Sequence, residues 1–478
     1  KGSIPIGENA PSYEADNSSS PYATYASTDL PSKYDLRNVD GNGKSYVTPV
    51  KDQNPYGTCW AFSTLASAES NILKKYDDSL DLAEMQLVWF HNKGTKNSAG
   101  KYEDPLNNFN GDHPISKPDI LYGGGHTLFA LYTIANWIGV VEEDPTTEYS
   151  VENAATIASN GLSYSYAFSK DAYHLKNVRI ANIETDISTV KSMVMNYGAV
   201  AISYTSYDPY YNTGDEGTGT AIYDPNGRYI DECGHAVAIV GWDDNFSRTN
   251  FNSNSRPSGN GAWLVRNSWG TGANSSGYFW MSYESKHYDT YAIASEYEPA
   301  STHDFCYQYD GGCSFTSTYF KNTTNYAANV FTAQHNETLD AVSFWMHNIV
   351  NVPYKVYIYH KLSDKNDPSS GTLVSTQEGT TTTSGYFMVP LSQKVKLAKG
   401  DTFAIVIEFE NTGTSGGIAD DSTLDYSVSV AVSGQSFLRQ AGGSWIDLSA
   451  EENRNFRIKA FTSKAPPGNR GTGGNGVK

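Results

Sequence analysis

Four polar residues with the chemistry of acyl transfer occur along the chain in the order glutamine, cysteine, histidine, asparagine. They are Gln53 and Cys59 in QNPYGTCWAF, His235 in CGHAVAIVGW and Asn267 in VRNSWG. Cys59 lies where a loop gives way to an expected helix, and a helix N-terminus lowers the pKa of a thiol placed there. A thiolate beside an imidazole is a nucleophile, so this set predicts covalent catalysis at Cys59.

The other three residues carry the groups that a cysteine nucleophile needs. His235 begins an apolar run that reads as a buried strand, a rigid support for a general base. Asn267 follows another such run, and its amide oxygen can accept from the imidazole and fix the tautomer. The Gln53 amide, with the Cys59 backbone N–H, is suited to an oxyanion hole. Each residue alone is more often structural, so the inference rests on the joint pattern.

This pattern resembles the papain-like cysteine peptidases, the family of the lysosomal cathepsins. The resemblance covers about residues 32–300 and is carried by YDLRN, TPVKDQ, GTCWAF, the glycines at 123–125, GAVAISY, GHAVAIVGW, NSWG and GYFWMSY. It implies a two-lobed enzyme with an open cleft between a helical and a β lobe. In that cleft Cys59 is the nucleophile, His235 the general base and then acid, Asn267 the orienting residue and Gln53 the oxyanion donor.

The resemblance also implies a substrate-binding surface around these four residues. Trp269 covers the contact between Asn267 and His235, and Gly124 and Gly125 offer backbone hydrogen bonds to an extended peptide. The main specificity pocket is lined by Ala201, Cys233 and Ser295. An alignment shifted by one residue places Glu296 in this pocket instead, which favours a basic substrate side chain.

The chain departs from the family in one disulfide and in its spacing. Tyr56 and Tyr122 stand where the family has a cysteine pair, which predicts packing in place of a covalent link. Cys59 and His235 are 176 residues apart, against roughly 130–150 in the family. Segments 91–120 and 243–260 read as inserted loops, which either narrow the cleft or decorate the surface.

The remaining cysteines and one polar loop leave alternatives open. Cys306 and Cys313 bracket YQYDGG and form either a hairpin disulfide or two free thiols, whereas Cys233 is expected to be free. In the loop 91–120, Asp104, Asp112 and His113 suggest a metal only weakly, and no metal is expected at the active site.

The whole chain divides into an arm, two folded domains and a linker. The fold class is α+β for the peptidase, with helices at 59–76, 126–138 and 186–197 before a β-rich half, then an all-β sandwich or jelly roll. The expected boundaries are 1–31 for a polar arm or pro-segment remnant, 32–300, 301–463, and 464–478 for a Gly/Pro-rich linker. Lys1 is followed by no apolar h-region, so any signal peptide is already removed, and the linker predicts further chain after Lys478.

Composition excludes several classes of function. The 478 residues contain 34 Lys plus Arg and 52 Asp plus Glu, a net charge of -18, which argues against nucleic acids and anionic membrane surfaces as partners. Hydrophobic residues make up 38% and aromatic residues 13%, enough for packed cores. No apolar run is long enough to span a bilayer. The low Lys content and abundance of Asn, Ser, Thr, Tyr and Gly favour a secreted or cell-surface protein, expected to be a monomer.

The β-sandwich after a papain-like unit resembles the lectin-like domain of clostridial cell-surface cysteine proteases. Trp345 and Trp445 could stack on the sugars of a cell-wall or surface carbohydrate bound by residues 301–463, or lie in the core. Asp420, Asp421 and Asp425 suggest structural calcium, or a solvated acidic loop.

The sequence as a whole predicts a secreted or cell-surface cysteine endopeptidase. It would hydrolyse peptide bonds of protein or peptide substrates through an acyl-enzyme, with no cofactor required for catalysis. The alternatives are a surface adhesin or carbohydrate-binding protein with a vestigial peptidase domain, and a cysteine-type cell-wall hydrolase. The four intact residues argue against the first, and NSWG with the Gln53 spacing argues against the second.

Overall fold

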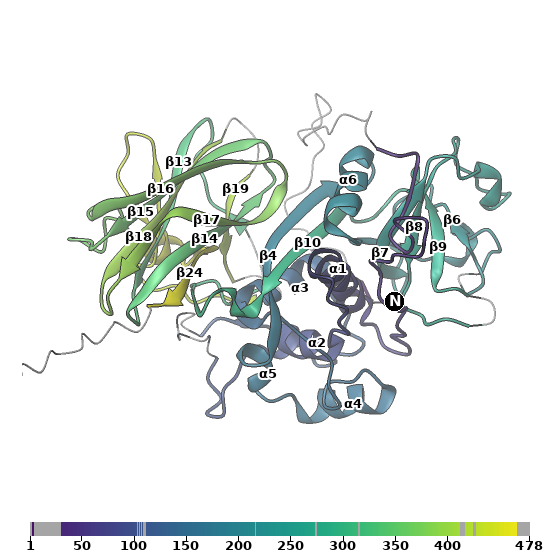
Figure 1. Cartoon of the computed structure of the whole chain (residues 1–478), viewed down its shortest axis with the longest axis horizontal. Coiled ribbons are helices and arrows are strands. Elements are labelled where there is room, and N and C mark those ends of the chain that lie inside the picture. The colour runs from purple at the N-terminus through teal and green to yellow at the C-terminus, as the bar shows by residue number, and fades with distance from the viewer. Residues whose placement is uncertain are drawn as a thin grey trace, which may run out of the picture.

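The structure, a computed structural model, has a domain of two lobes, which we call the peptidase domain after the sequence prediction, and an all-β domain beside it (Figure 1). It describes residues 2–3 and 30–465, apart from 103, 105, 107, 109–110, 216, 273–274, 314–315, 412–415 and 424–426. Most of the predicted arm and linker, residues 1, 4–29 and 466–478, lies outside the described residues.

The helical lobe is built around α1 (Cys59–Tyr76), the helix expected from the Ala-rich run. Every residue from Cys59 to Ile72 is buried, because α1 packs against the other helices on one side and against the sheet on the other. The remaining helices are α2 (Glu84–Lys93), α3 (Thr127–Thr133), the π-helical turn η2 (Ile134–Ile138), α4 (Val151–Asn160), α5 (Ser165–Phe168) and α6 (Ile187–Tyr197). Among the described residues, no helix is both long and apolar enough to cross a bilayer.

The β lobe carries His235 on β7 (Gly234–Asp243), a strand that is buried over nearly its whole length. On its two sides β7 pairs antiparallel with β5 (Val200–Thr205) and β8 (Ala262–Arg266). The other strands of this domain are β1 (Lys33–Asp35), β2 (His113–Pro114), β3 (Val140–Val141), β4 (Asp171–Asn182), β6 (Ala221–Ile222), β9 (Tyr278–Ser282) and β10 (Tyr291–Pro299), with 3-10 turns η3 (Asp208–Tyr210), η4 (Arg248–Asn250) and η5 (Ala300–Thr302).

The second domain is the all-β sandwich that alternating polar and apolar residues predicted. One sheet has the order β16-β15-β18-β13-β21-β22, and β11, β24, β14 and β17 form the facing layer. Apolar residues such as Phe344, Ile405 and Ile458 fill the space between the layers. The strands are β11 (Phe305–Tyr307), β12 (Thr316–Ser317), β13 (Thr323–Thr332), β14 (Glu337–His347), β15 (Val352–His360), β16 (Thr372–Thr381), β17 (Ser384–Leu397), β18 (Thr402–Asn411), β19 (Gly417–Asp421), β20 (Ser427–Val428), β21 (Ser436–Gln440), β22 (Ile446–Asp447), β23 (Asn455–Phe456) and β24 (Ile458–Lys464), with one helix, α7 (Leu448–Glu452).

The two domains share a β-sheet. Strand β17 of the sandwich pairs antiparallel with β4 of the peptidase, from Ser384 opposite Ile180 to Phe387 opposite Asn177. In Figure 1, β4 and β10 lie between the sandwich and the body of the peptidase. Gly385 makes this junction possible, because a Cβ there would lie 1.9 Å from the Val178 carbonyl oxygen.

The inserted segment 91–120 contacts the sandwich, a role that the sequence did not indicate. The Asp112 carboxylate accepts from the backbone N–H groups of Val430, at 2.7 Å, and Gly311, at 3.1 Å. Strand β2 pairs with β20 of the sandwich. The segment therefore contributes to the domain interface.

Several predicted ligand sites of the sandwich are occupied by protein contacts. Trp345 is fully buried with its ring 4.3 Å from that of Tyr132, so it is a core residue and no sugar platform. Asp421 pairs with Arg457 at 3.1 Å, so an internal cation already balances this carboxylate; Asp425 lies outside the described residues. No group of three metal-ligating side chains occurs among the described residues.

The cysteine alternatives are resolved in favour of free thiols. Cys306 and Cys313 are both buried and unbridged. Cys306 packs against Trp137 and Met388, in keeping with the usual role of a buried cysteine as a small apolar residue.

Candidate active site

Cys59 begins α1 and is completely buried. The backbone N–H of Ala236 donates to its Sγ at 3.3 Å. Because Ala236 directly follows His235 in β7, this hydrogen bond ties the strand that carries the imidazole to the thiol. The strand that carries His235 therefore meets Cys59 across the interface of the two lobes, although the two residues are 176 positions apart in the sequence.

His235 contacts both Asn267 and Trp269. Its Nε2 lies 2.8 Å from Asn267 Oδ1, which also accepts from the Ser268 backbone N–H at 2.8 Å. Since a backbone N–H can only donate, the shared atom is the amide oxygen, and Nε2 must donate to it. The Trp269 ring stacks on the imidazole with centroids 4.5 Å apart and planes at 16°, which shields the contact from water.

Gln53 is buried beside these residues with its amide orientation defined. Its Oε1 accepts from the Ser268 hydroxyl at 2.7 Å, and its Nε2 donates to the Tyr56 carbonyl at 2.8 Å. The backbone N–H of Gln53 also donates to the Ser268 carbonyl, at 2.8 Å. Ser268, which the sequence reading did not single out, therefore contacts both the Gln53 and the Asn267 amides.

Residues 2 and 3 lie in the cleft over the thiol. The Gly125 N–H donates to the Gly2 carbonyl at 2.8 Å, and the N–H groups of Gly2 and Ser3 donate to the Gly234 carbonyl at 2.9 and 3.2 Å. A Cβ on Gly2 would lie 2.0 Å from the Gly57 carbonyl oxygen, and φ is +117°, so this position requires glycine. These two residues belong to the predicted arm, residues 1–31, and contact Gly125 and Gly234.

The cover changes the electrostatics of the thiol. Burial raises the pKa of Cys59 above its ordinary value, although backbone N–H groups of Trp60, Ser3 and Ala236 oppose the shift. The sequence predicted a lowered pKa from the helix N-terminus. In the structure the pKa of Cys59 is raised instead, because desolvation beneath residues 2–3, here called the covering segment, outweighs the effect of the α1 helix dipole.

The Ser3 side chain contacts two residues outside the predicted specificity pocket. They are Ser203, two residues beyond Ala201 on the same face of β5, and Tyr288, in the loop before β10. Ala201 lies opposite Ile293 of β10 and Ala238 of β7. Of the other predicted residues, Cys233 is half-buried directly before Gly234, and the Gly124 carbonyl accepts from Lys117 at 2.7 Å.

Ser295 and Glu296 contact residues of α1 and β4. The Ser295 hydroxyl is 3.1 Å from that of Ser67, two turns along α1 from Cys59. Glu296 accepts from Lys75 at 2.9 Å and from Asn177 at 2.7 Å, near the sandwich junction. Because Glu296 is already paired with Lys75, it is not available to bind a basic substrate side chain.

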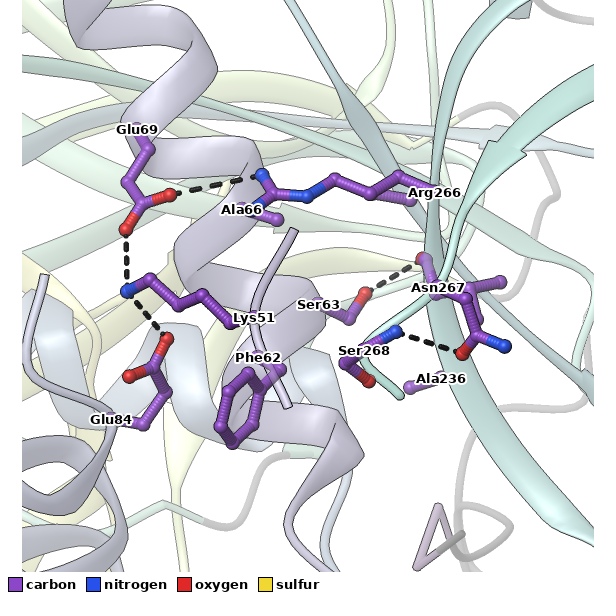
Figure 2. A pocket seen from close by; sticks show the side chains of 12 residues that line it. Lys51, Phe62, Ser63, Ala66, Glu69, Glu84, Ala236, Arg266, Asn267 and Ser268 are labelled. Carbon is purple, nitrogen blue, oxygen red and sulfur yellow. Dashed lines mark hydrogen bonds and ion pairs between the residues drawn. The ribbon is translucent and has the colours of Figure 1, made fainter. Parts of the chain in front are cut away.

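A buried charge cluster lies behind the site and joins the lobes (Figure 2). Lys51 lies between Glu69 of α1, at 2.8 Å, and Glu84 of α2, at 2.9 Å, while Arg266 of β8 is 3.7 Å from Glu69. Burial raises the pKa of Glu84 to about 7. Sequence reasoning missed this cluster; the available signal was charged residues inside apolar runs, such as Arg266 directly before Asn267.

Two tyrosines replace the missing disulfide by packing, as predicted. The rings of Tyr56 and Tyr122 meet edge to face with centroids 5.3 Å apart. The Tyr56 hydroxyl also donates to the Val151 carbonyl at 2.9 Å.

This fold and site place the chain in a known family. Residues 30–299 match the papain family of cysteine proteases, and residues 306–462 match a lectin-like domain. The first match covers more than half of the chain, so the protein belongs to the papain family. The chain therefore consists of a papain-like peptidase domain followed by a lectin-like β domain.

Individual relatives share one or both domains. Cysteine proteinase 2 of Dictyostelium discoideum is 28% identical over 271 residues, 55% of this chain and 66% of that protein. Cathepsin K of Gallus gallus is 25% identical over 240 residues, 50% of this chain and 57% of its own length. The chain thus aligns with less than two thirds of these relatives.

Two solved structures resemble the whole molecule. The cysteine protease and lectin-like domains of Cwp84, a surface layer associated protein of Clostridium difficile, superpose with a TM-score of 0.69 at 28% identity, covering 94% of this chain and 91% of that one. Cwp84 after propeptide cleavage gives 0.67 at 30% identity, covering 88% and 97%.

Proposed function

We propose that this protein is a secreted or cell-surface cysteine endopeptidase that cleaves protein substrates through Cys59, His235 and Asn267. The observation that carries the proposal is the oriented imidazole: Nε2 donates to Asn267 at 2.8 Å beneath Trp269, while the neighbouring Ala236 N–H contacts the thiol. Membership of the papain family supports the same reaction.

The geometry supports one role for each group in the proposed reaction. Because Nε2 is engaged by Asn267, Nδ1 is the atom that takes the proton from Cys59. The thiolate attacks the scissile carbonyl, and the oxyanion receives hydrogen bonds from the Cys59 N–H and the Gln53 amide. The imidazolium then protonates the leaving amine, and a water deprotonated by His235 hydrolyses the acyl-enzyme.

Backbone groups of the cleft serve to hold an extended substrate. The Gly125 N–H and the Gly234 carbonyl are the donor and acceptor that residues 2–3 now use. A substrate peptide that displaces these residues gains the same bonds, a form of recognition that depends little on side chains.

The similarity to Cwp84 supports a cell-surface location for this protein and a binding role for its lectin-like domain. Cwp84 is a surface layer associated protein, and the comparison extends over both domains. Trp445 is half-buried, with Arg439 over its ring at 4.5 Å. Binding of a carbohydrate by residues 301–463 stays a prediction.

The test is intact mass after treatment with a peptidyl epoxide that alkylates thiols, followed by peptide mapping. We expect one adduct at Cys59 in the wild type, no adduct in Cys59→Ala, and an adduct in Cys233→Ala, a matched control that removes the nearby half-buried thiol. Casein cleavage should follow the same pattern. An adduct that persists in Cys59→Ala contradicts the assignment. Cys59-independent adhesion without cleavage supports the adhesin, and Cys59-dependent clearing of cell-wall suspensions without casein cleavage supports the wall hydrolase.

A further inference from the structure

The side chain of Ser3 contacts two hydroxyl-bearing residues of the β lobe, Ser203 and Tyr288, and we call this place the Ser3 pocket. The Ser3 Oγ lies 3.0 Å from the Ser203 Oγ and accepts from the Tyr288 hydroxyl at 2.8 Å. Ser203 is 2% exposed. Ser3 Oγ therefore stands in for the side-chain hydroxyl of a bound peptide.

The two wall residues are held in place by their surroundings. Ser203 belongs to β5, whose residues are all buried. Tyr288 packs edge to face on Tyr229 with ring centroids 5.2 Å apart. Its neighbour Asp289 accepts from His126 Nε2 at 2.5 Å, which anchors this loop to the start of α3. A pocket with fixed walls discriminates between occupants better than a mobile one.

The chemistry of the pocket favours one class of side chain. Burial raises the pKa of Tyr288, which keeps its hydroxyl protonated as a donor. An aliphatic occupant offers no acceptor and leaves buried hydroxyls with fewer hydrogen bonds. The backbone of residue 3 packs closely against β7, since a Cβ on Gly234 would lie 2.1 Å from the Ser3 carbonyl oxygen.

We propose that this pocket selects serine or threonine at the substrate residue that pairs with Gly125, with Tyr288 and Ser203 as the residues that determine this specificity. The inference rests on the proposed peptidase function and adds the substrate class. The hydroxyl contacts are made by the side chain, so they apply whichever way the peptide runs along the cleft.

The first test uses the occupant that the chain itself provides. We measure the rate of Cys59 alkylation by iodoacetamide in wild type and in Ser3→Thr, Ser3→Ala and Ser3→Leu. If the pocket selects hydroxyls, Ser3→Thr stays within about twofold of wild type, whereas loss of the hydrogen bonds in Ser3→Ala and Ser3→Leu raises the rate about fivefold or more. A Ser3→Leu rate at or below the wild-type rate overturns the proposal. This readout needs no peptidase activity.

The second test uses a proteome-derived peptide library, with cleavage sites identified by mass spectrometry. Wild type should enrich Ser and Thr at one position on the N-terminal side of the cut, and Tyr288→Phe and Ser203→Ala should lose that enrichment. For a serine peptide, Tyr288→Phe should lower kcat/KM about tenfold, with little change for the alanine analogue. Tyr223→Phe is the matched control, since Tyr223 packs with Phe251 elsewhere in the β lobe.

Failure of the two ideas can be told apart. Cys59-dependent cleavage with aliphatic or basic residues enriched at that position overturns the pocket inference and leaves the peptidase proposal intact. Absence of any Cys59-dependent cleavage, with the Cys59 thiol alkylated normally, overturns both.

Discussion

At the scale of single residues, Ser268 links two amides that the reaction requires. Its hydroxyl donates to the side-chain oxygen of Gln53, Oε1, and its backbone N–H donates to the side-chain oxygen of Asn267, Oδ1. The direction of each amide dipole is thereby set before substrate binds, which is the condition for oxyanion stabilisation without reorganisation.

We expect Gln53→Ala to lower kcat by about 10²–10³ with little change in KM, because the lost donor acts mainly on the charged intermediate. Ser268→Ala should have a smaller effect on kcat, since the Gln53 Nε2 still donates to Tyr56. Steady-state kinetics on one fluorogenic peptide compare the variants. A Gln53→Ala enzyme with raised KM and unchanged kcat shows that the amide binds substrate and plays no part in the oxyanion hole.

The proposed catalytic residues could be singled out from the sequence because their neighbours carry recognisable chemistry, whereas Ser203 and Tyr288 could not. His235 and Asn267 sit at the ends of apolar runs, where a short strand defines their place. Ser203 lies two residues from the predicted Ala201, and the register between β5 and β7 decides which one reaches the cleft. Tyr288 lies in a loop outside any periodic pattern.

At the scale of elements, the covering segment and α1 together decide whether the thiol is accessible. Gly2 has no room for a side chain against Gly57. We expect Gly2→Val to displace the segment and to raise the rate of Cys59 alkylation about tenfold or more, a change set by loss of the three backbone hydrogen bonds. The control is Gly43→Val, which has φ of +97° but nothing within 4 Å of its Cβ position. Equal rates in Gly2→Val and wild type refute shielding by residues 2–3.

Displacing the segment should also move the pH dependence of the thiol. Burial raises the pKa of Cys59 in the covered state, so less thiolate is present at a given pH. Exposure removes the desolvation, the pKa falls, and the acid limb of the alkylation profile shifts to lower pH in Gly2→Val. Iodoacetamide rates across the pH range compare the two proteins. A shift to higher pH argues that the cover stabilises the thiolate.

The helices were largely predictable because their apolar spacing is local, and the role of the inserted segment was not. The runs at 59–76 and 186–197 fold as α1 and α6. Nothing local in 91–120 indicates that Asp112 caps two backbone N–H groups more than 190 residues away.

At the scale of the whole molecule, a continuous sheet and a buried ionic cluster couple the two domains. Arg457, between β23 and β24, pairs with Asp310 at 3.2 Å and Asp421 at 3.1 Å, and its guanidinium lies over the Tyr132 ring at 4.3 Å. Tyr132 belongs to α3 of the peptidase. Sequence periodicity could predict each domain, but it holds no information on pairing between β4 and β17, which are about two hundred residues apart.

This junction makes a prediction about cooperativity. In Gly385→Val the new Cβ would lie 1.9 Å from the Val178 carbonyl oxygen, so β17 can no longer pair with β4. We expect wild type to unfold in one calorimetric transition and Gly385→Val in two, the first several degrees lower, because the domains no longer stabilise each other. Gly400→Val, with φ of +90° and open space at its Cβ position, carries the backbone strain without the clash and should keep one transition. Cys59 contacts β7, which is separated from β17 in the sheet by β4, β10 and β5, so its alkylation rate well below the transition should stay unchanged in both variants. A single transition in Gly385→Val shows that the buried cluster around Arg457 is sufficient to couple the domains.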